Sequence, residues 1–310
     1  MRKAIVVLVL SLFLLAACQQ TRDERVQINY RSGSQGLVLR FLPNLPPMRL
    51  YDDQEFNVVV EVLNAGASPA GKAGDRVYLS GFDPTILTGV STFGADIPPS
   101  EGKTLYNMQG TQSYVDFKGI PQRLRAKKID RYPFTLLATS CYNYKTIASE
   151  NVCVDADPFA PTAKEKVCSS QPITFGTQGA PIAVTKVDVE PSPGRTRFTI
   201  YVSNVGAGAV FRPGLNYLQK CSPYDAKGLG FGEVDMVRVN DIQVSGLSIL
   251  ASCRPLDEGN LLRLYNGRGQ IVCELRSPRT NPAYFTPIVV DVEYGYRTTI
   301  ATPVELITSE

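Results

Sequence analysis

An alternating strand that runs into an Asn-x-Gly turn occurs twice in this chain, and this pattern most constrains its fold. Residues 56–63 (FNVVVEVL) alternate and run into the turn at residues 64–66 (NAG). Residues 198–202 (FTIYV) alternate in the same way, and the turn at residues 204–206 (NVG) lies 140 residues after the first. Alternation at period two indicates strands with one buried face. We therefore predict an all-β fold.

A second landmark also occurs twice. Residues 142–146 (YNYKT) and 294–298 (YGYRT) each stand between two apolar segments, 152 residues apart. Landmarks in the same order indicate a tandem duplication, although strands of similar composition could align by chance. The 25 glycines and 22 prolines favour many turns over a helical bundle. We expect two β-sandwiches, each with a tyrosine-rich turn near its end, the first joining strands at residues 134–140 and 146–154.

The first 18 residues resemble a prokaryotic export signal. Two basic residues precede an apolar run of twelve, which is too short for a permanent membrane span but typical of a signal peptide. Residues 15–18 (LAAC) then resemble the lipobox of prokaryotic lipoproteins, which implies cleavage before Cys18 and a lipid on its sulfur. An ordinary Ala-x-Ala cleavage site is the alternative. We predict a signal peptide at residues 1–17, a lipidated Cys18 with a polar tether to residue 35, and an extracytoplasmic, lipid-anchored location at the cell membrane or cell surface.

The two strand-and-turn segments also resemble the core of CARDB-type immunoglobulin-like modules, which occur in tandem in bacterial and archaeal surface proteins. This resemblance covers a minor part of each unit. It implies two immunoglobulin-like sandwiches, which we place at residues 36–157 and 182–310 with a linker at 158–181. The whole chain also resembles uncharacterised secreted archaeal proteins, a resemblance that implies no activity.

Six cysteines follow Cys18, and an even number in an exported chain indicates disulfide bonds. Fifteen connectivities are possible. Local spacing favours one set among them: Cys141–Cys153, Cys253–Cys273 and Cys168–Cys221. The second pair flanks Asn266-Gly267, a strong hairpin signal. Because the chain contains neither a Cys-x-x-Cys pair nor a histidine, we expect no zinc site and no redox pair.

Two clusters are candidate binding surfaces. The first consists of alternating tyrosines: Tyr142, Tyr144, Tyr294 and Tyr296. They could form aromatic patches for sugar rings or partner proteins, or they could pack across strands inside the sheet. The second is a basic run: Arg123, Arg125, Lys127, Lys128 and Arg131. It could contact anionic lipid headgroups or acidic polysaccharide, or it could be a solvated loop or an edge strand protected by charge.

Several chemistries are disfavoured by the composition. Without histidine, no mechanism can use imidazole, and a net charge of +3 is too small for general nucleic-acid binding. Residues 227–232 (KGLGFG) lack the ending of a phosphate-binding loop. Five acids could bind calcium between modules, although their spacing is not that of an EF-hand: Asp52, Asp53, Glu55, Asp155 and Asp157. We expect these acids to be solvated, and predict no metal and no cofactor.

The sequence therefore predicts a non-catalytic, envelope-anchored lipoprotein that acts as a structural, adhesion or binding module. Its expected partners are the membrane, through Cys18, and an envelope protein or glycan. Two alternatives remain open. One is a carbohydrate-active enzyme that uses an Asp/Glu pair, and the other is a surface-appendage subunit joined by strand exchange at sheet edges.

Overall fold

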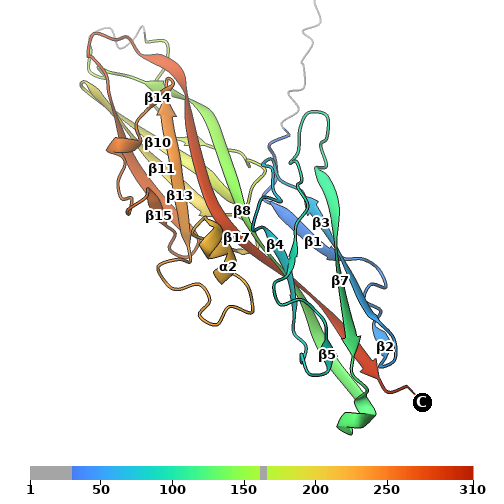
Figure 1. Ribbon diagram of the computed structural model, residues 1–310. Coiled ribbons are helices and arrows are strands. Elements are labelled where there is room, and N and C mark those ends of the chain that lie inside the picture. The colour runs from blue at the N-terminus through green and yellow to red at the C-terminus, as the bar shows by residue number, and fades with distance from the viewer. Residues whose placement is uncertain (1–29, 161–165, 310) are drawn as a thin grey trace, which may run out of the picture.

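The computed structural model describes residues 30–160 and 166–309 and consists almost entirely of β-strands. The all-β sandwich prediction is therefore confirmed. Figure 1 shows an elongated molecule whose two halves lie along one ribbon of two long strands. The predicted signal peptide and Cys18 lie outside the described residues. No helix in the described part of the chain is long and apolar enough to cross a membrane.

The two long strands form the axis of the molecule. β8 (Arg131–Val154) and β17 (Tyr284–Ile307) each contain 24 residues and pair antiparallel over their whole length. At roughly 3.3 Å per residue, each spans about 80 Å. Asn143 and Gly295 face each other at the centre of the ribbon.

Each long strand begins in its own half and ends in the other. β4 (Arg76–Ser80) pairs with residues 137–141, in the first half of β8, and β13 (Met236–Val244) pairs with residues 288–293, in the first half of β17. The end of β17 pairs in parallel with β2 (Arg49–Tyr51) of the first half. In the later part of β8, the Thr146 hydroxyl donates to the Ile182 carbonyl of the second half, at 2.7 Å. The two halves therefore exchange strand ends reciprocally.

The predicted tyrosine-rich turn at residues 142–144 is wrong, because β8 continues straight through it. Alternating tyrosines favour an extended strand, and Asn143 stands without the adjacent glycine that a two-residue hairpin turn favours. The strand after residue 144 pairs with β17 instead of folding back on its own beginning.

One half is built on a four-stranded sheet that faces the long ribbon. Its strands, in spatial order, are β1 (Leu37–Phe41), β3 (Phe56–Asn64), β7 (Thr111–Pro121) and β5 (Leu87–Thr88). Strand β6 (Ala95–Asp96) extends the large sheet beyond β4. A single helical turn, η1 (Leu124–Lys127), follows β7 at the far end of this half (Figure 1).

The other half repeats three strands of this order with different connections, and its fourth strand lies at the opposite edge of the sheet. Its sheet consists of β16 (Arg268–Arg276), β11 (Arg195–Asn204), β10 (Ile182–Ser192) and β9 (Ile173–Thr174). Smaller elements complete the half: β12 (Ala209–Phe211), α2 (Leu215–Lys220), β14 (Leu247–Ser248), η3 (Leu250–Ser252) and β15 (Leu261–Arg263). In position, β10, β11 and β16 correspond to β1, β3 and β7. Strand β9 lies within the predicted linker, and the predicted division of the chain did not include the two crossing strands.

The alternating apolar residues of the two predicted strands are buried in the core. Phe56, Val58, Val60 and Val62 of β3 are fully buried. Their counterparts Phe198, Ile200 and Val202 of β11 are fully buried as well. Full burial of one such side chain contributes about 1.5–3 kcal/mol. A single contiguous cluster of buried side chains extends through both halves.

Three disulfide bonds connect Cys141 to Cys221, Cys153 to Cys168, and Cys253 to Cys273. The predicted Cys253–Cys273 pair is confirmed. The predicted Cys141–Cys153 and Cys168–Cys221 pairs are wrong, because Cys141 and Cys153 lie on the same straight strand and cannot meet. Three disulfides indicate an oxidising, extracytoplasmic environment.

Candidate functional site: the tyrosine cluster and the β15–β16 groove

The four predicted tyrosines meet at the centre of the ribbon. Tyr142 faces Tyr296 and Tyr144 faces Tyr294 across the two strands. Neighbouring ring centroids lie 5.7 to 6.4 Å apart in tilted or edge-on geometry. All four side chains are at most 1% exposed. The rings therefore pack across the strands inside the sheet, as in the packing alternative, and form no exposed contact patch.

In the first half, the Asn-x-Gly turn binds the hydroxyl of Tyr144. This hydroxyl donates to Asn64 Oδ1 at 2.9 Å and accepts from the Ser68 amide at 3.2 Å. A Cβ on Gly66 would lie only 2.2 Å from the same hydroxyl oxygen. The turn thus needs both the amide side chain and the glycine to receive the tyrosine.

The second half repeats this arrangement. The Tyr296 hydroxyl donates to Asn204 Oδ1 at 3.0 Å and accepts from the Gly208 amide at 2.9 Å. A Cβ on Gly206 would lie 2.4 Å from that hydroxyl oxygen. We call the pairs Asn64–Tyr144 and Asn204–Tyr296 the two tyrosine locks.

The other two hydroxyls bind the beginnings of β1 and β10. Tyr142 accepts from the Leu37 amide at 3.0 Å, and Tyr294 accepts from the Ile182 amide at 3.4 Å. Burial raises the pKa of all four tyrosines above the ordinary value. The cluster is therefore neutral, hydrogen-bonded and structural.

The predicted basic run lies around η1, beyond the end of β7. Arg123 Nη1 donates to Ser309 Oγ at 2.6 Å and lies 3.6 Å from Asp52 Oδ1. The buried Asp52 also accepts from the Leu124 amide. Burial would raise the pKa of Asp52, but hydrogen bonds from Ser309 and Leu124 outweigh it and the pKa is lowered. All five members of the run are exposed: Arg123, Arg125, Lys127, Lys128 and Arg131. This arrangement fits the solvated-loop alternative.

The predicted calcium ligands are not brought together. Asp52 lies beside the end of β17, whereas Asp155 follows the end of β8 at the opposite end of the ribbon. Lys166 Nζ binds Asp155 Oδ2 at 2.7 Å. The described residues contain no group of three or more metal-ligating side chains, so the calcium hypothesis receives no support from them.

A groove opens where β15 and β16 diverge from one hairpin turn. Asn266 and Gly267 adopt positive φ of 50° and 75°, as the predicted hairpin signal requires. From this turn, β15 joins β13 in the large sheet while β16 joins β11 in the small sheet. The groove between the two diverging strands has a volume of about 490 Å³, which is within the usual range for ligand sites.

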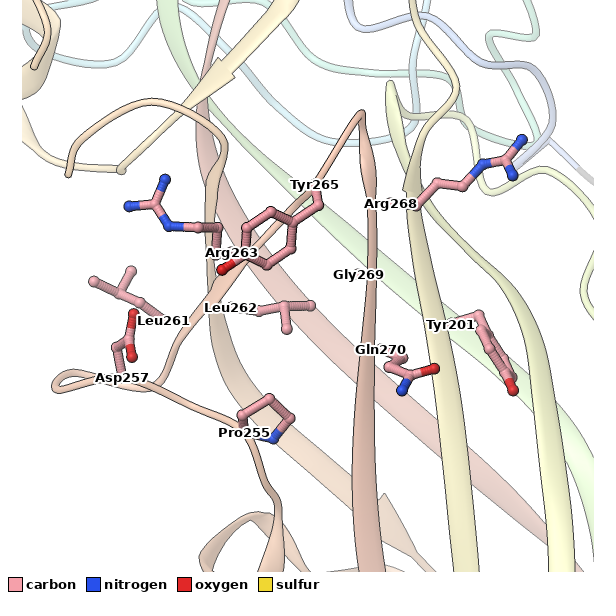
Figure 2. Close-up of a pocket in the computed structure, with 10 residues that line it drawn as sticks. All are labelled: Tyr201, Pro255, Asp257, Leu261, Leu262, Arg263, Tyr265, Arg268, Gly269 and Gln270. Carbon is pink, nitrogen blue, oxygen red and sulfur yellow. The ribbon is translucent and has the colours of Figure 1, made fainter. Parts of the chain in front are cut away.

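The groove is lined by apolar, aromatic and polar residues. Leu261 and Leu262, each 3% exposed, are the two leucines of this lining. Figure 2 shows Tyr265 on the β15 side and Tyr201 beyond β16. The Tyr265 side chain is 71% exposed. The polar lining residues are Asp257, Arg263, Arg268 and Gln270.

Two of these side chains are held by neighbours outside the groove. Arg263 Nη1 donates to the Phe231 carbonyl at 3.1 Å, and its guanidinium lies 4.5 Å from the Phe231 ring centroid. The Tyr201 hydroxyl donates to Asp188 Oδ2 at 3.1 Å, and this bond is the main cause that raises the tyrosine pKa. These contacts hold Arg263 and Tyr201 in place at the groove.

The sequence reasoning missed this groove, although one signal was available. The Asn266-Gly267 turn was used only to pair two cysteines, whereas it also fixes Tyr265 and Arg268 on its two flanks. Their backbones exchange hydrogen bonds of 2.7 and 3.0 Å. An exposed aromatic and a guanidinium beside a rigid turn are typical of a binding site.

A search of known protein families finds no match for this chain, and a search of curated proteins finds none either.

Proposed function

We propose that this chain is a non-catalytic, envelope-anchored lipoprotein that binds glycan in the β15–β16 groove. The observation that carries the proposal is the exposed ring of Tyr265 in the lining of the groove, with the buried Leu261 and Leu262 of β15 and with Arg268 on the opposite flank of the hairpin turn. A sugar ring has an apolar face that packs on an aromatic side chain. Its hydroxyls bind planar polar groups, which Asp257, Gln270 and Arg268 supply.

The carboxylates around the groove favour binding over hydrolysis. Most glycosidases use two Asp or Glu side chains, separated by roughly 5–9.5 Å. Among the described residues that line the groove, Asp257 supplies the one carboxylate. This composition supports a lectin-like role, in which a polysaccharide is held without being cut.

The anchoring part of the proposal depends on the sequence and the disulfides. Cys18 follows a signal-like segment and would carry the lipid. The three disulfides require the same export that lipidation requires. In this proposal, each half is a CARDB-like module that receives the end of one long strand from the other half.

Binding of envelope polysaccharide fragments, measured by calorimetric titration, tests the proposal. We expect Tyr265→Ala and Arg268→Ala each to weaken binding about tenfold, which corresponds to about 1.4 kcal/mol. Tyr114→Ala is the matched control, because Tyr114 is 50% exposed on β7 in the other half. Glycan affinity that survives both groove substitutions would contradict the site, and release of reducing sugar would favour the enzyme alternative.

One observation favours the appendage subunit as a second candidate. Beyond Cys141, β8 pairs with β17 on one side, and no described strand pairs with its other side. Unpaired backbone groups along such an edge can accept a strand from another subunit. Ordered polymers of the purified chain in sedimentation experiments would favour this candidate.

A further inference from the structure

The loop that precedes β7 exposes three neighbouring apolar side chains. Leu105 is 60% exposed, Tyr106 is 100% exposed and Met108 is 41% exposed. Isolated exposed apolar residues are ordinary in soluble proteins, whereas a cluster marks an interaction site. We call residues 104–109 the apolar loop.

Hydrogen bonds within the apolar loop direct its polar side chains inward. Thr104 Oγ1 accepts from the Tyr106 and Asn107 amides at 3.3 and 3.0 Å. The Asn107 side chain donates to the Gly110 carbonyl at 2.9 Å and accepts from the Gly110 amide at 3.1 Å. The turn is therefore fixed before any partner binds, and less conformational entropy is lost on binding.

The base of the apolar loop contacts the first described residues of the chain. Lys103 Nζ donates to the Ser32 carbonyl at 3.3 Å, and the Lys103 amide donates to the Gly66 carbonyl at 2.7 Å. Figure 1 shows the loop beside the N-terminal residues of the first half, just before β7. Tyr30 is the first described residue. Eleven residues lie between it and Cys18, so the two are at most about 40 Å apart along an extended chain.

We propose that Leu105, Tyr106 and Met108 insert into the surface of the membrane that holds the Cys18 lipid. This inference rests on the proposed lipid anchoring and adds a second contact to it. Tyrosine is enriched at headgroup depth, and aliphatic side chains enter the boundary of the acyl chains. The ammonium of Lys103 beside the loop favours anionic lipid.

This contact would orient the molecule on the membrane. The apolar loop precedes the first residue of β7, whereas the basic residues around η1 follow the last. The 11 residues of β7 separate the two by about 37 Å, at roughly 3.4 Å per residue. The apolar loop, rather than the basic run, would then be the membrane contact of the first half.

Fluorescence tests this inference, because the chain contains no tryptophan. Tyr106→Trp places a single tryptophan at the tip, where full exposure makes the substitution harmless to folding. The processed chain is mixed with vesicles of phosphatidylcholine and phosphatidylglycerol, and flotation reports whether it is anchored. We expect the emission of the anchored variant to move to shorter wavelength and to be quenched by brominated lipid. Phe93→Trp is the control, since Phe93 is 77% exposed elsewhere in the same half and should keep a water-like emission.

The outcomes separate the two proposals. If the Tyr106→Trp chain floats with the vesicles but its tryptophan keeps a water-like emission, the loop does not insert and this inference is overturned. If the emission of Phe93→Trp shifts equally, the contact is unspecific and the inference is overturned as well. A chain that does not float at all contradicts the lipid anchoring, and this inference fails with it.

Discussion

The two halves of the molecule have the same tyrosine contacts at the centre of the ribbon. They differ in the segment that leads into the third strand of each small sheet. At the centre, the tyrosine locks are nearly superposable in their chemistry, with hydroxyl-to-amide distances of 2.9 Å at Asn64 and 3.0 Å at Asn204. At the periphery, β7 is entered from the long apolar loop, whereas its counterpart β16 is entered from a tight hairpin turn. Packing constrains the tyrosine locks in both halves, whereas the segments that lead into β7 and β16 are free to differ.

The two proposed binding sites lie where the halves differ. The apolar loop and the β15–β16 groove both lie next to the third strand of a small sheet, one in each half. Neither contributes buried side chains to the tyrosine cluster. The tyrosine cluster common to both halves therefore holds the ribbon together. The apolar loop before β7 carries the proposed membrane contact, and the groove beside β16 carries the proposed glycan contact.

The largest expected effect on the free energy of unfolding comes from removing the disulfide that joins the two halves. Cys141 and Cys221 are separated by 80 residues, and Cys253 and Cys273 by 20. Because the entropy restricted in the unfolded chain grows with loop length, removing the first bond should cost about 4.5 kcal/mol and the second about 3.3 kcal/mol. Guanidinium unfolding of the two double Cys→Ala variants measures both. An equal or reversed order would contradict the cross-half role of Cys141–Cys221.

The tyrosine locks should differ slightly in strength. Asn64 is fully buried and also donates to the Ser100 carbonyl, whereas Asn204 is half-buried. Because unsatisfied buried groups cost about 1–3 kcal/mol each, we expect Asn64→Ala to lose about 3 kcal/mol and Asn204→Ala about 2 kcal/mol. Thermal and denaturant unfolding measure the loss. The exposed Asn240→Ala is the control and should stay within about 0.5 kcal/mol.

Alkaline pH should weaken both locks. Burial raises the folded-state pKa of Tyr144 and Tyr296, so their contribution to stability is complete below the unfolded pKa of about 10 and is lost as pH rises above it. Replacing either tyrosine with Phe should reduce the pH dependence in this range by about 1.4 kcal/mol per pH unit. Unfolding curves and tyrosinate absorbance measure it. Simultaneous ionisation of all tyrosines in folded protein would contradict the buried cluster.

The smallest effect on stability is expected in the apolar loop and in the β15–β16 groove. Tyr265 and Tyr106 are mostly exposed, so replacing either with Ala should change the free energy of unfolding by no more than about 0.5 kcal/mol. The same substitutions should weaken glycan and membrane binding, respectively. A large loss of stability at either site would mean that the side chain supports the fold.

The sequence predicted the local elements far better than their partners. Alternation at residues 56–63 and 198–202 predicted β3 and β11 and their buried faces, and Asn266-Gly267 predicted a hairpin. The long strands were not predicted, because nothing local to Tyr142 or Tyr144 shows that the partner lies some 150 residues away in β17. The same error misassigned Cys141 and Cys153. The groove was missed because two strands that leave one turn for different sheets have no local signature.

The central claim is that the exchanged ends of β8 and β17 make the two halves one cooperative unit. Scanning calorimetry of the processed, oxidised chain tests it most directly. The account predicts a single transition whose calorimetric and van't Hoff enthalpies agree. Two resolved transitions, with Asn64→Ala lowering only one of them, would show that each half unfolds alone and would contradict it.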